Sequence, residues 1–444
     1  MKKQFNKTNY SLDSIAGYPE EKKEAVEIIN LFKHFNMYQA NGVTIPKGLI
    51  LSGSPGVGKT LMAKVISAES NVPFYEYEAS ESNTLRKSIS NIKNIYDEAR
   101  KNAPSIVFID ELDELVSSKE YISDMSRIML KTLLTEIDGV KNSDGVLTIA
   151  TTNNYRCIPE SLKRSGRMDR HISFDLPNLD SREAILRLYA KDKVLLKNID
   201  FKEIAGKTAG FSGADLKTLI NESLIKNVSA DCIEITNEDI SNLIPTITFK
   251  GIRKDLDKPP LDNVCYHELG HFICEVVLNK IIPSISTEKI GDVEGHVSIF
   301  EDYSYDAKSQ SFTECKNNAI ISLGGYAAEK VFMNETYTGV SYDFSKFEST
   351  IKLMASSGMF DVKDIFNNNK SSSYEYFLDR TTNTQVIGED DIRVKCFNEY
   401  LEIATGIINR NKELLLVLFK KLKEEKKIDS KVAKEIIKVY KVRK

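Results

Sequence analysis

Apolar and polar positions follow two different patterns along the chain, and the change falls near its middle. In the first half, apolar-rich stretches at 45–51, 105–110 and 146–152 have the length of buried strands. Helical spacing of apolar residues follows at 61–70 and again through 181–243, which predicts helices in both places. Strands that alternate with helices are typical of a parallel sheet with helices on its faces. We therefore expect an α/β module, followed by a helical subdomain.

The second half is predicted to be mainly helical. Apolar residues keep helical spacing at 264–276, at 314–333 and from Ile392 onward. Residues 283–302 predict short strands with an exposed edge, to which an extended peptide can add a strand. The stretch 361–373 is rich in Asn and Ser and predicts a loop. This change of pattern indicates a second domain.

The strongest chemical signal is HELGH, in the first predicted helix of the second half. His267 and His271 stand four residues apart, which puts both imidazoles on one helix face. Two neutral imidazoles and one carboxylate suit Zn²⁺ and leave a fourth position for water, whose pKa then falls to about 7. Glu268, beside the first histidine, is placed to take a proton from that water. The chain has only five histidines, so this arrangement favours a metal site over two surface histidines.

The third zinc ligand stays open from chemistry alone. His296, Glu329 and Asp343 all follow the HELGH helix in the chain and offer a nitrogen or a carboxylate. A carboxylate completes a two-histidine zinc set, and a glutamate on a later helix, such as Glu329, is a common solution. For Asp343 the alternative is to cap the helix that follows it.

A second chemical signal lies between the first predicted strand and the first predicted helix. The residues GSPGVGKT have the strand, glycine-rich loop and helix context of a Walker A motif. In such a loop the backbone N–H groups cradle phosphate oxygens, while a lysine reaches the β- and γ-phosphates and a threonine holds Mg²⁺. We therefore expect ATP with Mg²⁺ at Gly53, Ser54, Pro55, Gly56, Val57, Gly58, Lys59, Thr60 and the adjoining Leu61.

Polar residues also follow the later predicted strands. Asp110 and Glu111 end the apolar stretch at 105–110, where we expect Asp110 to support Mg²⁺ and Glu111 to orient the attacking water. Asn153 ends the next strand, beside the expected γ-phosphate. Arg167 and Arg170 have no obvious partner in their own chain. Their basic segment is either an exposed loop or a source of arginine fingers for a neighbouring subunit.

Length and composition restrict the class of protein. A chain of 444 residues predicts about two or three domains. The net charge of −3 gives no basic excess that would favour nucleic acid. The six cysteines are scattered, without a CxxC pair, which favours reduced thiols over a disulfide framework. No stretch approaches the roughly 18 apolar residues of a transmembrane helix, so we expect no membrane span and a cytoplasmic location.

Together, GSPGVGKT, FIDELDEL, ATTNN, RSGRMDR and GFSGADL resemble the AAA+ ATPases. With YHELGH and LGGYAAEK added, nearly the whole chain resembles the FtsH-type AAA+ zinc proteases. The resemblance implies Asn153 as sensor 1 and Arg167 and Arg170 as fingers that act in trans, and it favours Asp343 as the third zinc ligand. Residues that it assigns to the nucleotide site are Gly213 and Ala214, packed near the nucleotide, and Ile15 and Ala16, packed on adenine.

The resemblance also implies the order of the domains. We expect an ATPase large subdomain at 1–178, a helical lid at 179–246, a linker at 247–263 and a zinc peptidase domain at 264–444. The expected fold class is an α/β P-loop AAA+ module, with a parallel sheet and a helical lid, followed by a mainly α-helical zinc peptidase domain.

The sequence departs from the family in two places. No transmembrane anchor precedes the ATPase module, which indicates either a naturally soluble member or a truncated chain. The family's pore loop, an aromatic residue, a hydrophobic residue and a glycine, aligns with Thr84, Leu85 and Arg86. Only Leu85 offers an apolar side chain for gripping a substrate, so we expect weak unfolding of stable proteins.

Motifs and resemblance together predict an ATP-dependent zinc endopeptidase with Zn²⁺, ATP and Mg²⁺ as cofactors. Fingers that act in trans imply a homo-oligomer, namely a hexameric ring, that moves unfolded or damaged protein substrates to the zinc site. The alternative is an ATP-driven remodeller or chaperone with weak or no processive proteolysis. The intact HELGH argues against this alternative, and the altered pore loop argues for it.

Overall fold

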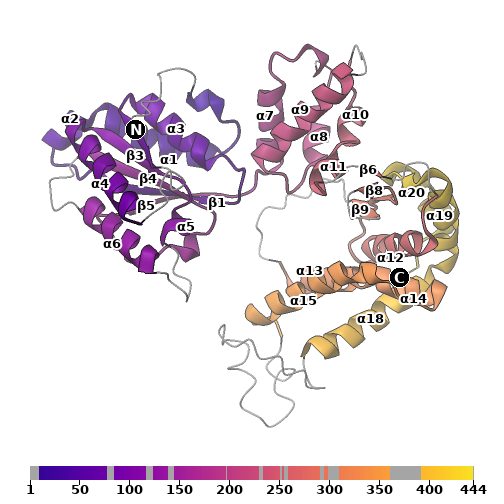
Figure 1. The fold of residues 1–444 in the computed structure, drawn as a ribbon. Coiled ribbons are helices and arrows are strands. Elements are labelled where there is room, and N and C mark those ends of the chain that lie inside the picture. Colours follow the sequence, from indigo (N-terminus) through magenta and orange to yellow (C-terminus); the bar gives the residue numbers. More distant parts are fainter. Residues whose placement is uncertain are drawn as a thin grey trace, which may run out of the picture. The chain divides into compact units, whose positions relative to one another are not determined.

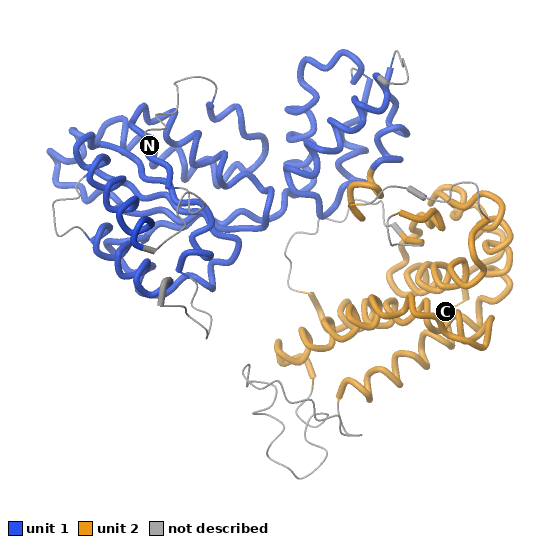
Figure 2. Tube along the Cα trace, in the orientation of Figure 1, with its two compact units in different colours: residues 1–243 blue, residues 244–444 orange. Residues whose placement is uncertain are grey.

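The chain divides into two compact units, Met1–Leu243 and Ile244–Lys444 (Figure 2). The computed structural model describes residues 10–77, 85–116, 124–138, 145–196, 198–229, 234–250, 253–254, 259–290, 295–298, 310–360 and 392–443. The first unit contains the α/β elements, and the second is mainly helical (Figure 1). The predicted loop at 361–373 and Thr84 of the pore segment lie outside the described residues.

Within residues 48–174 of the first unit, five strands form a parallel sheet with the order β2-β3-β4-β1-β5. The strands are β1 (Gly48–Gly53), β2 (Phe74–Tyr77), β3 (Ser105–Ile109), β4 (Val146–Thr152) and β5 (Arg170–Phe174). Every residue of β3 and β4 is buried, because helices cover both faces of a parallel sheet. Double burial explains the continuous apolar runs, and the strands predicted at 105–110 and 146–152 are confirmed.

Helices cover this sheet on both faces. They are α1 (Pro19–Lys33), α2 (Phe35–Ala40), α3 (Lys59–Ser70), α4 (Leu85–Lys101), α5 (Leu112–Val116) and α6 (Asp124–Asp138), with short 3-10 turns η1 (Leu12–Ser14) and η3 (Tyr155–Cys157). Tyr96 of α4 and Leu133 of α6 pack with Val107 and Ala150 of the sheet in one core cluster. Leu85 and Arg86 of the pore segment lie in the first turn of α4, and the Arg86 side chain is exposed.

The helical subdomain predicted at 181–243 is confirmed. It consists of α7 (Leu179–Ala190), the 3-10 turn η4 (Val194–Leu196), α8 (Phe201–Lys207), α9 (Gly213–Ser229) and α10 (Asn237–Ser241). Side chains of Asn178, Asp200 and Thr236 accept backbone N–H groups at the starts of α7, α8 and α10. Such caps satisfy donors that have no partner inside a helix, and they explain why these short helices begin where they do.

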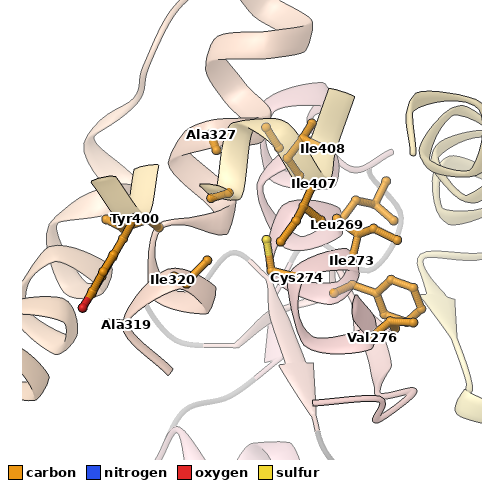
Figure 3. Packing of buried hydrophobic residues seen from close by; sticks show 14 of the residues in the cluster. Leu269, Ile273, Cys274, Val276, Ala319, Ile320, Ala327, Tyr400, Ile407 and Ile408 are labelled. Atoms are coloured by element: carbon orange, nitrogen blue, oxygen red, sulfur yellow. The ribbon is translucent and has the colours of Figure 1, made fainter. Parts of the chain in front are cut away.

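The second unit is built around α12 (Asp262–Leu278). Leu269, Ile273 and Cys274 of this helix lie in a core with side chains from α13, α14 and α18, such as Ile320, Ala327 and Ile407 (Figure 3). The other helices are α11 (Ile244–Thr248), α13 (Phe312–Ser322), α14 (Gly324–Met333), α15 (Ser341–Ser356), α18 (Ile392–Arg410), α19 (Lys412–Glu425) and α20 (Ser430–Tyr440), with the 3-10 turn η5 (Thr338–Val340). The predicted fold class, an α/β module followed by a mainly helical domain, is confirmed.

Short strands accompany these helices. They are β6 (Arg253–Lys254), β7 (Ser284–Ser286), β8 (Lys289–Ile290), β9 (His296–Ser298) and β10 (Lys427–Ile428). Strand β9 pairs with β7, and β7 pairs with β10, all antiparallel. The stretch 247–263, predicted as a linker, contains part of α11 and all of β6, which pairs with β8.

One helix prediction is wrong. The stretch 314–333, predicted as one helix, contains most of α13 and all of α14, which meet at Leu323. The carbonyl of Gly270 lies so close to Gly324 that a Cβ on Gly324 would come within 2.6 Å of its oxygen. Close backbone approach of α12 and α14 therefore requires glycine here. This is a tertiary constraint that helical spacing alone does not contain.

Among the described residues, no helix is long and apolar enough to cross a membrane.

Candidate metal centre and nucleotide site

Two histidines of α12 and one aspartate of α15 converge in the second unit. The Nε2 atoms of His267 and His271 lie 2.9 and 3.2 Å from the same oxygen of Asp343, Oδ2. The two Nε2 atoms are 3.1 Å apart. Asp343 is 76 residues from His267 in the sequence, and the fold of α15 brings it back to the HELGH face. The three side chains form the one group among the described residues whose donor atoms could hold a metal ion.

The other nitrogen of each histidine has a fixed partner. Nδ1 of His267 lies 2.7 Å from Oε1 of Glu329, a residue of α14 that is 2% exposed. Nδ1 of His271 donates to the carbonyl oxygen of Ile321, at 2.7 Å. Hydrogen bonds at Nδ1 direct the lone pair of Nε2 toward the common point. Neither contact could be predicted from the motif, because both partners come from helices far along the chain.

The carboxylate of Glu329 also joins two elements of the site. Its second oxygen accepts the backbone N–H of Tyr337 at 2.9 Å. Tyr337 directly precedes η5, which leads into α15 and Asp343. Of the candidates for the third ligand, Asp343 therefore lies at the Nε2 atoms and Glu329 lies behind His267. His296 is buried in strand β9.

The electrostatics of the cluster follow from burial and from these contacts. Burial lowers the pKa of His267, but the hydrogen bonds to Asp343 and Glu329 outweigh it and raise this pKa to about 10. Burial opposes ionisation of Asp343 as well, yet the two histidines hold its pKa below the usual range. Burial raises the pKa of Glu268. Gly295 faces Glu268 so closely that a Cβ there would come within 2.8 Å of its Cγ.

Close packing places α14 directly behind His267. A Cβ on Gly325 would come within 2.5 Å of Cε1 of His267, and a Cβ on Gly270 within 2.2 Å of the carbonyl oxygen of Gly324. Leu269, which takes the position between Glu268 and Gly270, is fully buried in the core. The glycines let α14 approach closely enough for Glu329 to reach the imidazole.

These residues fit a zinc ion. Two imidazole nitrogens and one carboxylate oxygen, all within 4.8 Å of one another, are a ligand set of catalytic zinc sites, and the imidazoles lose their extra proton when they bind the metal. Both histidines are oriented by outer hydrogen bonds, as histidine ligands of zinc generally are. The convergence of three donor atoms on one point is the observation that supports this fit.

The glycine-rich loop of the first unit connects β1 to α3. Lys59 is 8% exposed, and its Nζ donates to the carbonyl oxygens of Gly53 and Ser54 at 2.7 and 2.9 Å and to Oδ1 of Asn153 at 2.9 Å. Gly53, Gly56 and Gly58 all have positive φ angles, which favour glycine. The remaining residues of the segment are the exposed Ser54 and Pro55, the buried Val57, and the half-buried Thr60 and Leu61.

Burial lowers the pKa of Lys59, while the nearby Asp110, Asp113 and Glu111 act in the opposite direction. Asp110 and Glu111 follow β3, and Thr60 Oγ1 lies 3.4 Å from Oδ1 of Asp110. The hydroxyl of Thr151, at the end of β4, donates to the same oxygen of Asp110 and accepts the N–H of Glu111 at 3.0 Å. The pKa of Glu111 is raised, and the largest cause is the nearby negative charge of Glu114. The motifs in the sequence did not indicate these contacts of Thr151 with Asp110 and Glu111.

The GFSGADL segment lies against the glycine-rich loop. The N–H of Ala214 donates to the carbonyl oxygen of Gly56 at 3.0 Å, and a Cβ on Gly56 would come within 2.9 Å of Cβ of Ala214. Gly213 is also close, since its Cβ would lie 3.3 Å from that carbonyl oxygen. Ile15 is buried and Ala16 is half-buried, and they follow η1, which packs against α3.

The prediction that Arg167 has no partner in its own chain is wrong. Its Nε and Nη2 lie 2.6 and 2.7 Å from the two carboxylate oxygens of Asp138, the last residue of α6. Asp138 stands 29 residues earlier, and only the fold brings the pair together. The bidentate contact raises the pKa of Arg167. Arg170 begins β5, next to His171, and is exposed.

Comparison with known families matches both units. The family model described as "ATPase family associated with various cellular activities (AAA)" matches residues 49–176, the AAA+ lid domain matches 198–242, and peptidase family M41 matches 256–436. The chain is thus similar to AAA ATPases in its first unit and to M41 peptidases in its second.

Relatives match along almost the whole chain. The chain is 32% identical to the ATP-dependent zinc metalloprotease FtsH 2 of Phytoplasma mali (strain AT), over 97% of this chain and 63% of the relative. It is 30% identical to the ATP-dependent zinc metalloprotease FtsH of Lactiplantibacillus plantarum, over 98% and 60%. For FtsH of Bacillus subtilis (strain 168) the values are 29%, 97% and 70%. The chain spans less than two thirds of the length of the first two relatives.

A parallel-sheet unit with a glycine-rich loop, followed by a helical unit with a HELGH centre, has the features of an AAA module joined to an M41-type peptidase domain. The three family models and the relatives identify the family that has this pair of domains. The chain belongs to the FtsH-type AAA+ zinc metalloproteases.

Proposed function

We propose that this chain is an ATP-dependent zinc endopeptidase that degrades polypeptides. The observation that carries the proposal is the meeting of His267, His271 and Asp343 at one point, with Glu268 in the same helix. The glycine-rich loop around Lys59 in the first unit supports the second part of the proposal, the dependence on ATP. The names of the relatives, ATP-dependent zinc metalloproteases, agree with it.

In this proposal His267, His271 and Asp343 hold Zn²⁺. Bound zinc polarises the scissile carbonyl and lowers the pKa of water. Glu268 accepts a proton from the attacking water as its oxygen bonds to the carbonyl carbon. Glu268 then gives that proton to the amide nitrogen as the C–N bond breaks. Glu329 holds the ring of His267 throughout by accepting its Nδ1–H.

At the nucleotide site, Lys59 exchanges its present carbonyl contacts for the β- and γ-phosphates of ATP. Thr60 and Asp110 hold Mg²⁺, Glu111 orients the attacking water, and Asn153 stands beside the γ-phosphate. The remaining donors are the backbone N–H groups of the glycine-rich loop at 53–58 other than Pro55, which has none. Leu61, Gly213, Ala214, Ile15 and Ala16 lie around the nucleotide.

Arg167 and Arg170 act on the nucleotide of a neighbouring subunit, which requires a homo-oligomer, and we propose a hexameric ring. Arg167 then leaves Asp138 when it engages ATP. The pair is partly exposed, with side-chain exposures of 22% and 44%, so water reaches both side chains and can replace the contact when Arg167 turns to a phosphate.

The substrates in this proposal are unfolded or damaged proteins in the cytoplasm, where ATP is available. The proposed division is a large ATPase subdomain at 1–178, a lid at 179–246, a linker at 247–263 and the peptidase domain at 264–444. The spans matched by the AAA and lid models, 49–176 and 198–242, lie inside the first two proposed ranges, whereas the M41 span, 256–436, begins inside the proposed linker.

Digestion of fluorescently labelled casein, an unfolded protein, tests the proposal. It is measured with and without ATP, and with zinc or with 1,10-phenanthroline, which removes zinc and leaves Mg²⁺ in place. We expect digestion only with ATP and zinc together, while ATP hydrolysis persists with the chelator. ATP hydrolysis without any zinc-dependent cleavage would favour the remodeller instead, and absence of both activities would refute the proposal.

A further inference from the structure

Thr151 contacts both members of the acidic pair that follows β3. Strands β3 and β4 pair in parallel, and Ile109 lies opposite Ala150. The residues that come next are Asp110, directly after β3, and Thr151, within β4, at the carboxyl edge of the sheet. Thr151 is 1% exposed, and its hydroxyl donates to Oδ1 of Asp110 and accepts the N–H of Glu111 at 3.0 Å.

The bond to Glu111 concerns a residue with an uncommon backbone conformation. Glu111 has a φ of 53°, in the left-handed region that residues with a Cβ seldom adopt. Such conformations persist where neighbouring groups hold them in place, and they cluster at active sites. The Thr151 hydroxyl accepts the N–H of Glu111 in this conformation, so it stabilises the backbone turn at Glu111.

The bond to Asp110 fixes a carboxylate. Oδ1 of Asp110 faces the hydroxyl of Thr151 from β4 and, at 3.4 Å, the hydroxyl of Thr60 from α3. A hydroxyl that donates to one carboxylate oxygen restricts rotation about the Cβ–Cγ bond. Carboxylates that support a metal are commonly held in this way, and loss of the outer partner weakens metal binding or activity about 10–100-fold.

We propose that Thr151 is a positioning residue for nucleotide hydrolysis. Its single hydroxyl sets the orientation that Asp110 presents to Mg²⁺ and the backbone conformation from which Glu111 orients water. The donor and acceptor functions of one hydroxyl are both used, so the two acidic residues are positioned together. This inference rests on the proposed ATPase function.

The test compares Thr151→Val, which keeps the branched shape and loses the hydroxyl, with Thr151→Ser, which keeps the hydroxyl. Thr148→Val is the matched control, because Thr148 lies in the same strand, is also 1% exposed, and its hydroxyl lies 2.8 Å from that of Tyr96 instead. Three quantities are measured: hydrogen exchange at the Glu111 amide without nucleotide, binding of a fluorescent ATP analogue without Mg²⁺, and the Mg²⁺ dependence of ATP hydrolysis.

In Thr151→Val we expect the amide hydrogen of Glu111 to exchange faster than in the wild type. This variant should need about 10–100-fold more Mg²⁺ for half-maximal ATP hydrolysis, and its kcat should be lower. Binding of the analogue without Mg²⁺ should stay unchanged. Thr151→Ser should resemble the wild type, and Thr148→Val should change neither the Glu111 exchange nor the Mg²⁺ dependence. Thr151→Ala, a second variant without the hydroxyl, should behave as Thr151→Val does.

Wild-type exchange and wild-type Mg²⁺ dependence in either hydroxyl-free variant would overturn the inference while leaving the ATPase proposal intact. An equal shift of the Mg²⁺ dependence in Thr148→Val would also overturn it, since general loosening of β4 would then explain the effect. A wild-type protein that hydrolyses no ATP would instead overturn the proposed function, and this inference with it.

Discussion

Replacing Glu329 by glutamine tests how the metal centre is held together. Glu329 accepts two hydrogen bonds, from Nδ1 of His267 at 2.7 Å and from the N–H of Tyr337 at 2.9 Å. A glutamine of the same size has one acceptor oxygen, and its NH₂ group only donates. One of the two donors must therefore lose its partner, or His267 must change tautomer and turn a protonated Nε2 toward the metal position.

The expected magnitude follows from this geometry. Removing an outer partner of a histidine ligand lowers metal affinity about 10–100-fold, which corresponds to about 1.4–2.8 kcal/mol of binding free energy. We expect Glu329→Gln to bind zinc more weakly by this factor, measured by competition with a chromogenic chelator, and to lose casein digestion at low free zinc. Added zinc should restore part of the digestion.

Glu275→Gln is the matched control. Glu275 lies in α12, is buried to a similar extent with 5% exposure, and bonds the side chain of Asn279. This variant should keep the zinc affinity of the wild type. If both variants lost zinc equally, loss of a buried charge anywhere in the core would explain the result. Unchanged zinc affinity in Glu329→Gln would refute the orienting role of Glu329.

Three further predictions concern other parts of the chain. Gly324→Ala should lower the melting temperature by about 2–12 °C, because overpacking costs about 1–3 kcal/mol; an unchanged melting temperature would mean that α12 and α14 separate easily. Arg167→Ala should bind ATP but hydrolyse it poorly, whereas Asp138→Asn should keep thermal stability within about 1 kcal/mol; full ATPase activity in Arg167→Ala would exclude a finger role. A stable folded reporter with an unstructured tag should be degraded more slowly than its destabilised variant, and Thr84→Phe with Arg86→Gly should narrow the gap; equal rates for both reporters in the wild type would show that the pore segment grips strongly.

The parts of the fold that sequence predicts well are those whose pattern is set by burial. The runs at 105–110 and 146–152 are apolar because β3 and β4 are covered on both faces, and the lid helices follow their caps and spacing. The break at Leu323 was not predictable, since α13 and α14 share one helical pattern. Directly after the break, Gly324 lies against Gly270 of α12, a contact that exists only in the folded unit.

The candidate site divides in the same way. HELGH predicts two converging imidazoles from local geometry, whereas chemistry alone left His296, Glu329 and Asp343 open as the third ligand. The structure brings Asp343 to the Nε2 atoms and Glu329 to Nδ1 of His267, a distinction of a few ångströms that depends on packing. The partner of Arg167 was missed for the same reason, because Asp138 becomes its neighbour only through the fold.

The most direct test of the central claim is casein digestion by Glu268→Gln, with ATP and saturating zinc. The variant keeps both histidines and Asp343 but lacks the carboxylate that accepts a proton from water. General-base catalysis contributes about 10²–10⁴-fold, so we expect digestion to fall by at least about 100-fold while ATP hydrolysis continues. Digestion by Glu268→Gln at a rate close to that of the wild type would contradict the account of this chain as a zinc peptidase that uses the HELGH glutamate.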